Sequence, residues 1–187
     1  MNIFYLSDNP VEAAQMQCDK HVPKMIVESG QMLSTAHRML DGILIKKPSK
    51  SGKRMVNYWQ HNDAYLEEHL YKAVHHNHPS TLWTRESAGN YDWHYAHFIA
   101  LCDEYTYRFG KVHETRTKLE TILKQRPVNI PDVGQQPIRR AMKVFPDLMA
   151  LPSAVDAYRQ FYLRDKADFA LWQKGRAAPQ WWTEAYA

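Results

Sequence analysis

Residues 18–42 read CDKHVPKMIVESGQMLSTAHRMLDG, and we expect the rest of the chain to pack around them. The stretch predicts a helix from about Asp19 to about Leu40, because Asp19 is a favoured N-cap and Gly42 a favoured stop. Pro23 is tolerated in the first turn of a helix, so it also places the start here. At helical spacing, one side of this helix is apolar and a neighbouring side is polar. The apolar side carries Val22, Ile26, Leu33, Ala36 and Leu40, and the polar side His21, Lys24, Glu28, Gln31 and Thr35.

The first turn of this helix is a candidate anion site. Backbone N–H groups and the positive end of the helix dipole point outward at a helix N-terminus. Lys20, His21 and Lys24 add positive charge there, which a bound phosphate would offset. Asp19 would offset the same charge as a capping partner, and Lys24 with Glu28 has the spacing of an ordinary surface pair. Both interpretations remain open from the sequence.

Length and composition indicate one soluble domain covering residues 1–187. The chain has 187 residues, 44% of them hydrophobic, which is enough for a core. A net charge of +4 is compatible with nucleic acid or nucleotide phosphates. Two cysteines are too few for a disulfide framework or a cysteine zinc cluster. With no apolar run that could span a membrane and no signal peptide, we expect a cytoplasmic protein without a membrane partner.

The rest of the chain predicts a mostly α fold, a single compact helical domain with a short extended N-terminus. Residues 11–17, 58–75, 90–109, 114–125 and 154–174 have helical patterns, whereas residues 126–152 form a Pro-rich wrapping segment with about one turn near 138–142. Residues 42–57 read as a basic loop that is either simply solvated or lies over a nucleic-acid backbone. Its cations are Lys46, Lys47, Lys50, Lys53 and Arg54.

A second candidate site lies on the 90–109 helix, where polar residues share one stripe. One interpretation is a divalent-metal site, because imidazole and carboxylate groups are competent ligands. That site would draw on His75, His78, His94 and His97, with Glu104 as an additional ligand. Another is a pocket that stacks a base, binds phosphate and moves a proton. That pocket would use Arg85, Asn90, Tyr91, Trp93, Glu104, Arg108 and His113. A hydrogen-bonded polar core is the third interpretation, and no nucleotide-binding glycine motif or serine elbow is present.

Linked segments covering nearly the whole chain resemble a family of small proteins encoded by tailed phages, including cyanophages. They are residues 2–42, NHPSTLW (77–83), RES (85–87), NYDW (90–93), EYTYRFGKVH (104–113), AYRQFYL (157–163) and PQWW (179–182). We place this family near the phage enzymes of thymidine hypermodification, the amino acid:DNA transferases. The resemblance implies a reaction in which an amine displaces pyrophosphate from an activated 5-hydroxymethyluracil in DNA. The partners would be DNA and a small amine or amino acid, in the host-cell cytoplasm, and no cofactor would be required.

This chemistry implies roles for particular residues. A phosphate or nucleic-acid surface would use Lys20, Lys24, Arg38, Arg85, Asn90, Tyr91, Trp93, Arg108, Lys111 and His113. The amine must lose a proton, and the candidate bases are His21, Glu28, His37 and Glu104. We expect His21 and Lys24 to face Arg85, Glu104 and Arg108 across one cleft. Two alternatives remain: a histidine-dependent metal hydrolase or glycosylase acting on nucleic acid or nucleotides, and a non-enzymatic accessory protein that binds a host factor or a nucleotide, with Trp181 and Trp182 as its contact.

Overall fold

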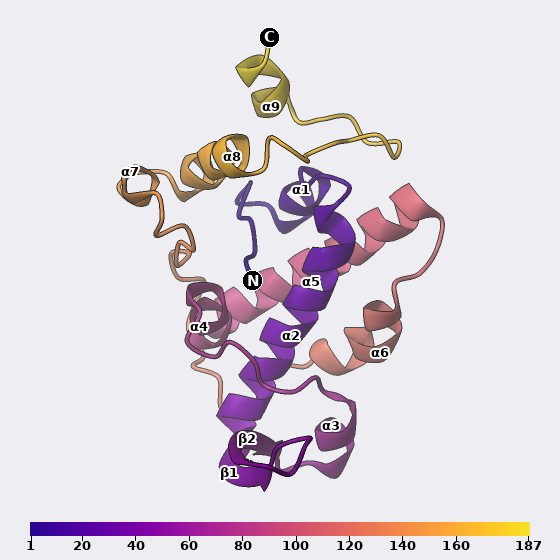
Figure 1. Cartoon of the computed structure of the whole chain (residues 1–187), viewed down its shortest axis with the longest axis vertical. Coiled ribbons are helices and arrows are strands. Elements are labelled where there is room, and N and C mark those ends of the chain that lie inside the picture. Colours follow the sequence, from indigo (N-terminus) through magenta and orange to yellow (C-terminus); the bar gives the residue numbers. More distant parts are fainter.

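Helix α2 forms the axis of the structure, and both the hairpin and the other long helix pack against it (Figure 1). The computed structural model describes all 187 residues. The elements in chain order are α1 (Pro10–Gln15), α2 (His21–Asp41), β1 (Gly42–Pro48), β2 (Met55–His61), α3 (Ala64–His69), α4 (Pro79–Glu86), α5 (Ala88–Phe109), α6 (Glu114–Leu123), α7 (Pro146–Met149), α8 (Ala154–Asp165) and α9 (Gln180–Ala185). Helices account for 51% of the chain, which confirms the prediction of one mostly helical compact domain.

The core lies where α2 and α5 cross. Fully buried side chains from both helices and from the non-helical N-terminal segment meet there, namely Ile3, Leu6, Ile26, Leu33, Phe98 and Leu101. Helix α6 approaches α2 so closely that a Cβ at Gly30 would lie 2.9 Å from Thr115 Cγ2. The hairpin with α3 lies at one end of the molecule and α9 at the opposite end (Figure 1). None of the helices combines the length and the apolar character that crossing a membrane requires.

The predicted cap of α2 is wrong. The Asp19 carboxylate accepts hydrogen bonds from Arg108 at 3.1 Å and from the Gln173 N–H at 2.7 Å, and α2 starts two residues later without a side-chain cap. The same contacts explain why the last long helix, α8, ends at Asp165 and not near residue 174. Beyond α8 the chain folds back beside the start of α2, where Leu171 O accepts the Asp19 N–H at 2.9 Å.

Residues 42–61 form a β-hairpin where a basic loop and the start of a helix were predicted. The two strands are antiparallel, with Gly42 opposite His61 and Pro48 opposite Met55. Residues 49–54 connect them, and Gly52 there adopts a φ of +72° that favours glycine. Short runs rich in β-branched and aromatic residues suit a strand as well as a buried helix segment, which is why periodicity alone misassigned them. The helix expected over 58–75 is reduced to α3.

The remaining elements follow the predictions more closely. Ser87 caps α5 by accepting the Asn90 N–H at 3.1 Å, and Gly110 ends it at a φ of +69°. The Pro-rich segment wraps the start of α5, where its carbonyls accept the N–H groups of Ala88 and Gly89. Its helical turn is α7 instead of the turn expected near 138–142.

Candidate functional site

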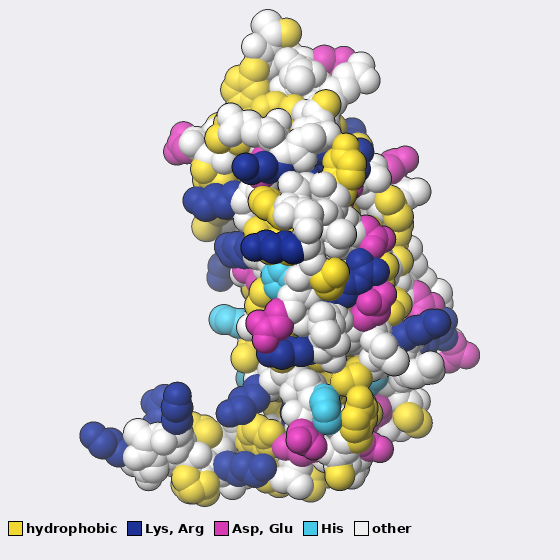
Figure 2. Space-filling model, turned by 90° about the vertical axis from the view of Figure 1, so that its right-hand side faces the viewer, with side chains coloured by type: hydrophobic (Ala, Val, Ile, Leu, Met, Phe, Trp, Pro, Cys, Tyr) yellow, Lys and Arg dark blue, Asp and Glu magenta, His cyan; other side chains and the backbone are white.

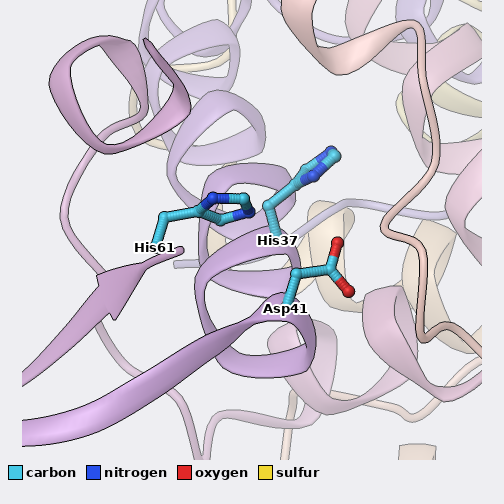
Figure 3. Close-up of side chains that lie close together, drawn as sticks. All are labelled: His37, Asp41 and His61. Atoms are coloured by element: carbon cyan, nitrogen blue, oxygen red, sulfur yellow. The ribbon is translucent and has the colours of Figure 1, made fainter. Parts of the chain in front are cut away.

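Two histidines and an aspartate converge at the root of the hairpin (Figure 3). His37 and Asp41 are one turn apart on α2, so they share a face of that helix. His61 is the last residue of β2 and lies opposite Gly42, the residue that follows Asp41. One ligand atom from each side chain lies within 4.8 Å of the other two. Hairpin register therefore joins residues that are 20 or more positions apart in the chain.

Hydrogen bonds fix which nitrogen of His37 carries its proton. The Tyr91 hydroxyl donates its hydrogen to Leu123 O at 2.9 Å. It must therefore accept the hydrogen bond that joins it to His37 Nε2 at 2.8 Å. The lone pair of the neutral ring is then on Nδ1, and this atom is buried without any partner. Burial lowers the pKa of His37 to about 4, against partial opposition from Asp41, so the lone pair is available at neutral pH.

His61 has the opposite arrangement. The Asp63 N–H donates to His61 Nδ1 at 3.0 Å, so the neutral ring carries its proton on Nε2. That atom is also buried without a partner. The site thus contains one unused nitrogen acceptor, on His37, and one unused N–H donor, on His61. Buried polar groups are nearly always hydrogen-bonded in folded proteins, so two unpartnered nitrogens beside one pocket make it a candidate ligand site.

Asp41 is held in place by the segment that follows α6. Its carboxylate accepts the N–H of Val128 at 2.7 Å and the N–H of Asn129 at 2.9 Å. The side-chain amide of Asn129 donates a further hydrogen bond at 3.0 Å. These donors fix the orientation of the carboxylate.

The three side chains open into a pocket of about 600 Å³ between α2, the start of α3 and the end of α6. Asp41 and Asp63 place two carboxylates in its wall. The only cation in the wall is Arg126, which donates to the Asp92 carboxylate through Nε and Nη2 and whose Nη1 lies 3.8 Å from Asp132. The wall of the pocket therefore carries net negative charge, which favours an amine ligand.

A buried arginine holds the root of the hairpin against α2. Arg38 donates to the carbonyls of Trp59, Glu67, Leu70 and Tyr71, to the Glu67 carboxylate and to the Tyr58 hydroxyl. Glu67 in turn accepts the His61 N–H at 2.8 Å, and so connects Arg38 to the site. Burial alone would raise the pKa of Glu67, but its hydrogen bonds from Tyr58, His61 and Arg38 hold it below the usual value.

The structure does not assemble the predicted histidine metal set. His94 uses both ring nitrogens, on Thr84 at 2.7 Å and Ser29 at 3.1 Å. His97 does the same with Pro10 O at 2.9 Å and Gln17 at 3.2 Å. Neither ring has a free ligand atom. His78 caps α4 by accepting the Ser80 N–H, and His75 is exposed on the preceding turn.

The predicted cleft between the start of α2 and the α5 stripe is not formed. His21 is buried against Phe4 and bonded through Nδ1 to the Tyr162 hydroxyl at 2.6 Å. The His21 N–H is taken by Cys18 O, so this first turn lacks the free donor that an anion would use. Burial, with lysines nearby, lowers the pKa of His21 to about 3. Lys20 and Lys24 are exposed beside it.

Carboxylates proposed as bases are committed to ion pairs. Glu28 accepts the Asn2 N–H at 2.9 Å and lies 3.5 Å from the N-terminal amine. Glu104 pairs with Arg108 at 2.9 Å and with Arg176. Arg85 lies before the first residue of α5, and Arg108 lies near its last residue. Because a helix of 22 residues is about 33 Å long, Arg85 and Arg108 lie at opposite ends of α5. These groups therefore do not share one site.

The remaining predicted contacts have structural partners. Asn90 links Trp83 O at 2.8 Å to the Gln136 N–H at 2.7 Å. Tyr91 and Trp93 are buried, and Trp93 Nε1 donates to Asp8 O, so neither ring can stack on a flipped base as it stands. His113 caps α6, Lys111 is exposed nearby, and the Trp181–Trp182 pair packs on Tyr162.

Of the predicted bases, only His37 lies in the pocket, and the sequence interpretation missed Asp41 and His61. A usable signal exists for Asp41, because its spacing of four from His37 places both on one helix face. His61 could be found only through the hairpin register.

Comparison with known proteins adds no relative. No protein-family model, curated protein or solved structure matches this chain. Function must therefore be argued from the site itself.

The cluster is also the one place where three potential metal ligands meet. His37 Nδ1 and the Asp41 carboxylate both retain lone pairs and fit a divalent cation. His61 does not fit without a change, because its Nδ1 accepts the Asp63 N–H and its free nitrogen is protonated. A metal bound by all three would need this backbone hydrogen bond to break.

Proposed function

We propose that the protein is a DNA-modifying enzyme whose reaction centre is the His37–Asp41–His61 cluster, and that it transfers an amine onto an activated pyrimidine base. The observation that carries the proposal is the pair of unpartnered, buried imidazole nitrogens, an acceptor on His37 and a donor on His61. Such a pair can take a proton from one reactant and donate a hydrogen bond to another.

The geometry of the acceptors suits a primary amine. His37 and Asp41 each contribute a ligand atom to a group whose members all lie within 4.8 Å of one another. Two acceptors this close can both accept hydrogen bonds from one primary amine, which carries more than one N–H. The negative wall of the pocket favours the same ligand.

The proposed step uses the two histidines in different roles. The amine nitrogen forms a bond to the exocyclic carbon of a 5-pyrophosphoryloxymethyl uracil, and the bond from that carbon to the pyrophosphate oxygen breaks. Pyrophosphate leaves with the bonding electron pair. The extra proton on the amine passes to His37 Nδ1, and His61 Nε2–H donates to the departing oxygen. Asp41 orients the amine through its second N–H and stabilises the imidazolium that forms on His37.

Metal-dependent hydrolysis of a nucleic acid or nucleotide is the second candidate. It is favoured by the closeness of the three ligand atoms. Here the cation would supply a Lewis acid, and His37 with Asp41 would hold it. The protonated Nε2 of His61 stands against this candidate, which is why we place it second.

Nucleoside mass spectrometry tests the proposal directly. The protein is incubated with DNA that carries pyrophosphorylated 5-hydroxymethyluracil and with a mixture of amino acids and polyamines, and the DNA is digested. We expect a new nucleoside with the mass of an amine adduct, formed equally well after treatment with a chelator. Failure to form an adduct with any amine would reject the transferase. Stoichiometric bound metal, together with cleavage or loss of the base that a chelator abolishes, would favour the second candidate.

A further inference from the structure

The hairpin, residues 42–61, projects from the body of the protein as a basic arm (Figure 2). It contains five Lys and Arg residues between Lys46 and Arg54, and no Asp or Glu. None of these five cations takes part in the ion pairs of the structure. Their charge is therefore free to neutralise an external polyanion.

The same arm exposes apolar side chains. Ile43, Leu44 and Met55 are 52%, 50% and 56% exposed. Exposed apolar side chains next to unpaired cations are typical of a binding surface. They match a nucleic-acid groove, which has phosphates along its edges and base methyl groups on its floor. This pattern favours the groove of a nucleic acid over an acidic protein.

We propose that the arm binds duplex DNA by lying along the major groove. The major groove of B-DNA is about 12 Å wide and admits a two-stranded β-ribbon. Two paired strands are about 5 Å apart, and seven residues span about 23 Å, so the ribbon fits the groove and would follow about seven base pairs. The cations of the arm contact phosphates on either side, and its apolar side chains contact base edges.

This placement also connects the arm to the pocket. Asp41 directly precedes the arm and His61 is its last residue, so the reaction centre lies at its root. Substituents at C5 of a pyrimidine project into the major groove. An arm in that groove therefore brings the pocket to the side of the duplex where a 5-substituent is exposed. This link rests on the proposed function, whereas the binding surface itself does not.

Matched charge variants test the surface. The arm variant replaces Lys50, Lys53 and Arg54 by Gln. The control replaces Lys124, Lys143 and Lys174 by Gln, and these lysines are also exposed and unpaired, so both variants lose three positive charges. Affinity for a 20-base-pair duplex is measured by fluorescence anisotropy at several salt concentrations. For the arm variant we expect about tenfold weaker binding or more, and a salt slope reduced by about 2 to 3, since each lost phosphate contact removes about 0.9. The control should change the slope by less than about 1.

Three results would overturn the inference. They are equal losses in the arm and control variants, tighter binding of single-stranded DNA than of the duplex, and equal binding of an RNA duplex, whose deep, narrow major groove does not admit the ribbon. His37→Gln separates this inference from the proposed function, because it should leave duplex binding unchanged. Intact binding by the arm, with no amine adduct from the wild-type protein, would refute the function alone.

Discussion

Replacing Arg38 by Met should destabilise the protein severely, although the sequence alone suggests a phosphate ligand there. The Arg38 side chain is 1% exposed and donates to six acceptors, four of them backbone carbonyls. Met preserves most of the volume but leaves the four carbonyls without this donor and removes the positive charge that faces the Glu67 carboxylate. Removing one partner of a buried charged pair costs about 3–5 kcal/mol. That is a large fraction of the roughly 5–15 kcal/mol by which a typical domain is stable.

Urea denaturation followed by circular dichroism measures this effect. With a slope of about 2 kcal/mol per molar urea, the midpoint should fall by roughly 1.5–2.5 M. Arg116→Met is the control, because Arg116 forms a surface cluster with Asp103 and Glu120 whose loss should cost about 1 kcal/mol or less. A midpoint for Arg38→Met within about 0.5 M of the wild type would refute the structural role, since that shift corresponds to only about 1 kcal/mol.

Three further predictions concern packing, pH and the site. Gly89→Ala should lower the free energy of unfolding by about 1–3 kcal/mol or more, because the new Cβ would lie 2.1 Å from Gln135 N. Gly134→Ala is the control in the same urea assay and should be nearly neutral, because its Cβ would meet no atom within 4 Å. Burial lowers the pKa of His97 to about 4; its stabilising contribution is complete above about pH 6.5 and is lost as pH falls toward 4, at about 1.4 kcal/mol per pH unit. The urea midpoint should therefore fall between pH 7 and 5, and fall less in His97→Gln; identical pH profiles would contradict this. Asp41→Asn should abolish amine-adduct formation while duplex affinity stays within about twofold, if the arm alone binds phosphates, and an unchanged adduct yield would remove Asp41 from the site.

Sequence patterns predicted the long helices but not the hairpin. The helix over residues 90–109 and its stop at Gly110 were correctly predicted because both the period and the caps agree there. The strands of the arm hold only short apolar runs, which fit either a strand or a helix. The pairing of the two strands joins residues that are distant in the sequence, so local sequence patterns do not reveal it. The same limitation placed the cap of α2 on Asp19, whose carboxylate is instead taken by Arg108.

The site was only partly predictable for a related reason. His37 was identified as a candidate base by residue type, but so were His21, Glu28 and Glu104. What distinguishes His37 is that Nδ1 has no partner while Nε2 does, and this depends on Tyr91, far away in the sequence. Residue type shows which side chains could act, and only the packed structure shows which of them remain free.

The most direct test of the central claim compares two buried histidines in the adduct assay. His37→Gln retains a side-chain N–H that can reach the Tyr91 hydroxyl but removes the basic ring nitrogen that would take the proton, whereas His21→Gln removes a ring that already has its partner in Tyr162. Circular dichroism and duplex binding first establish that both variants fold. The account predicts that His37→Gln forms no amine adduct and that His21→Gln retains most of the wild-type yield. Full activity in His37→Gln, with loss in folded His21→Gln, would contradict it and move the reaction centre to the start of α2.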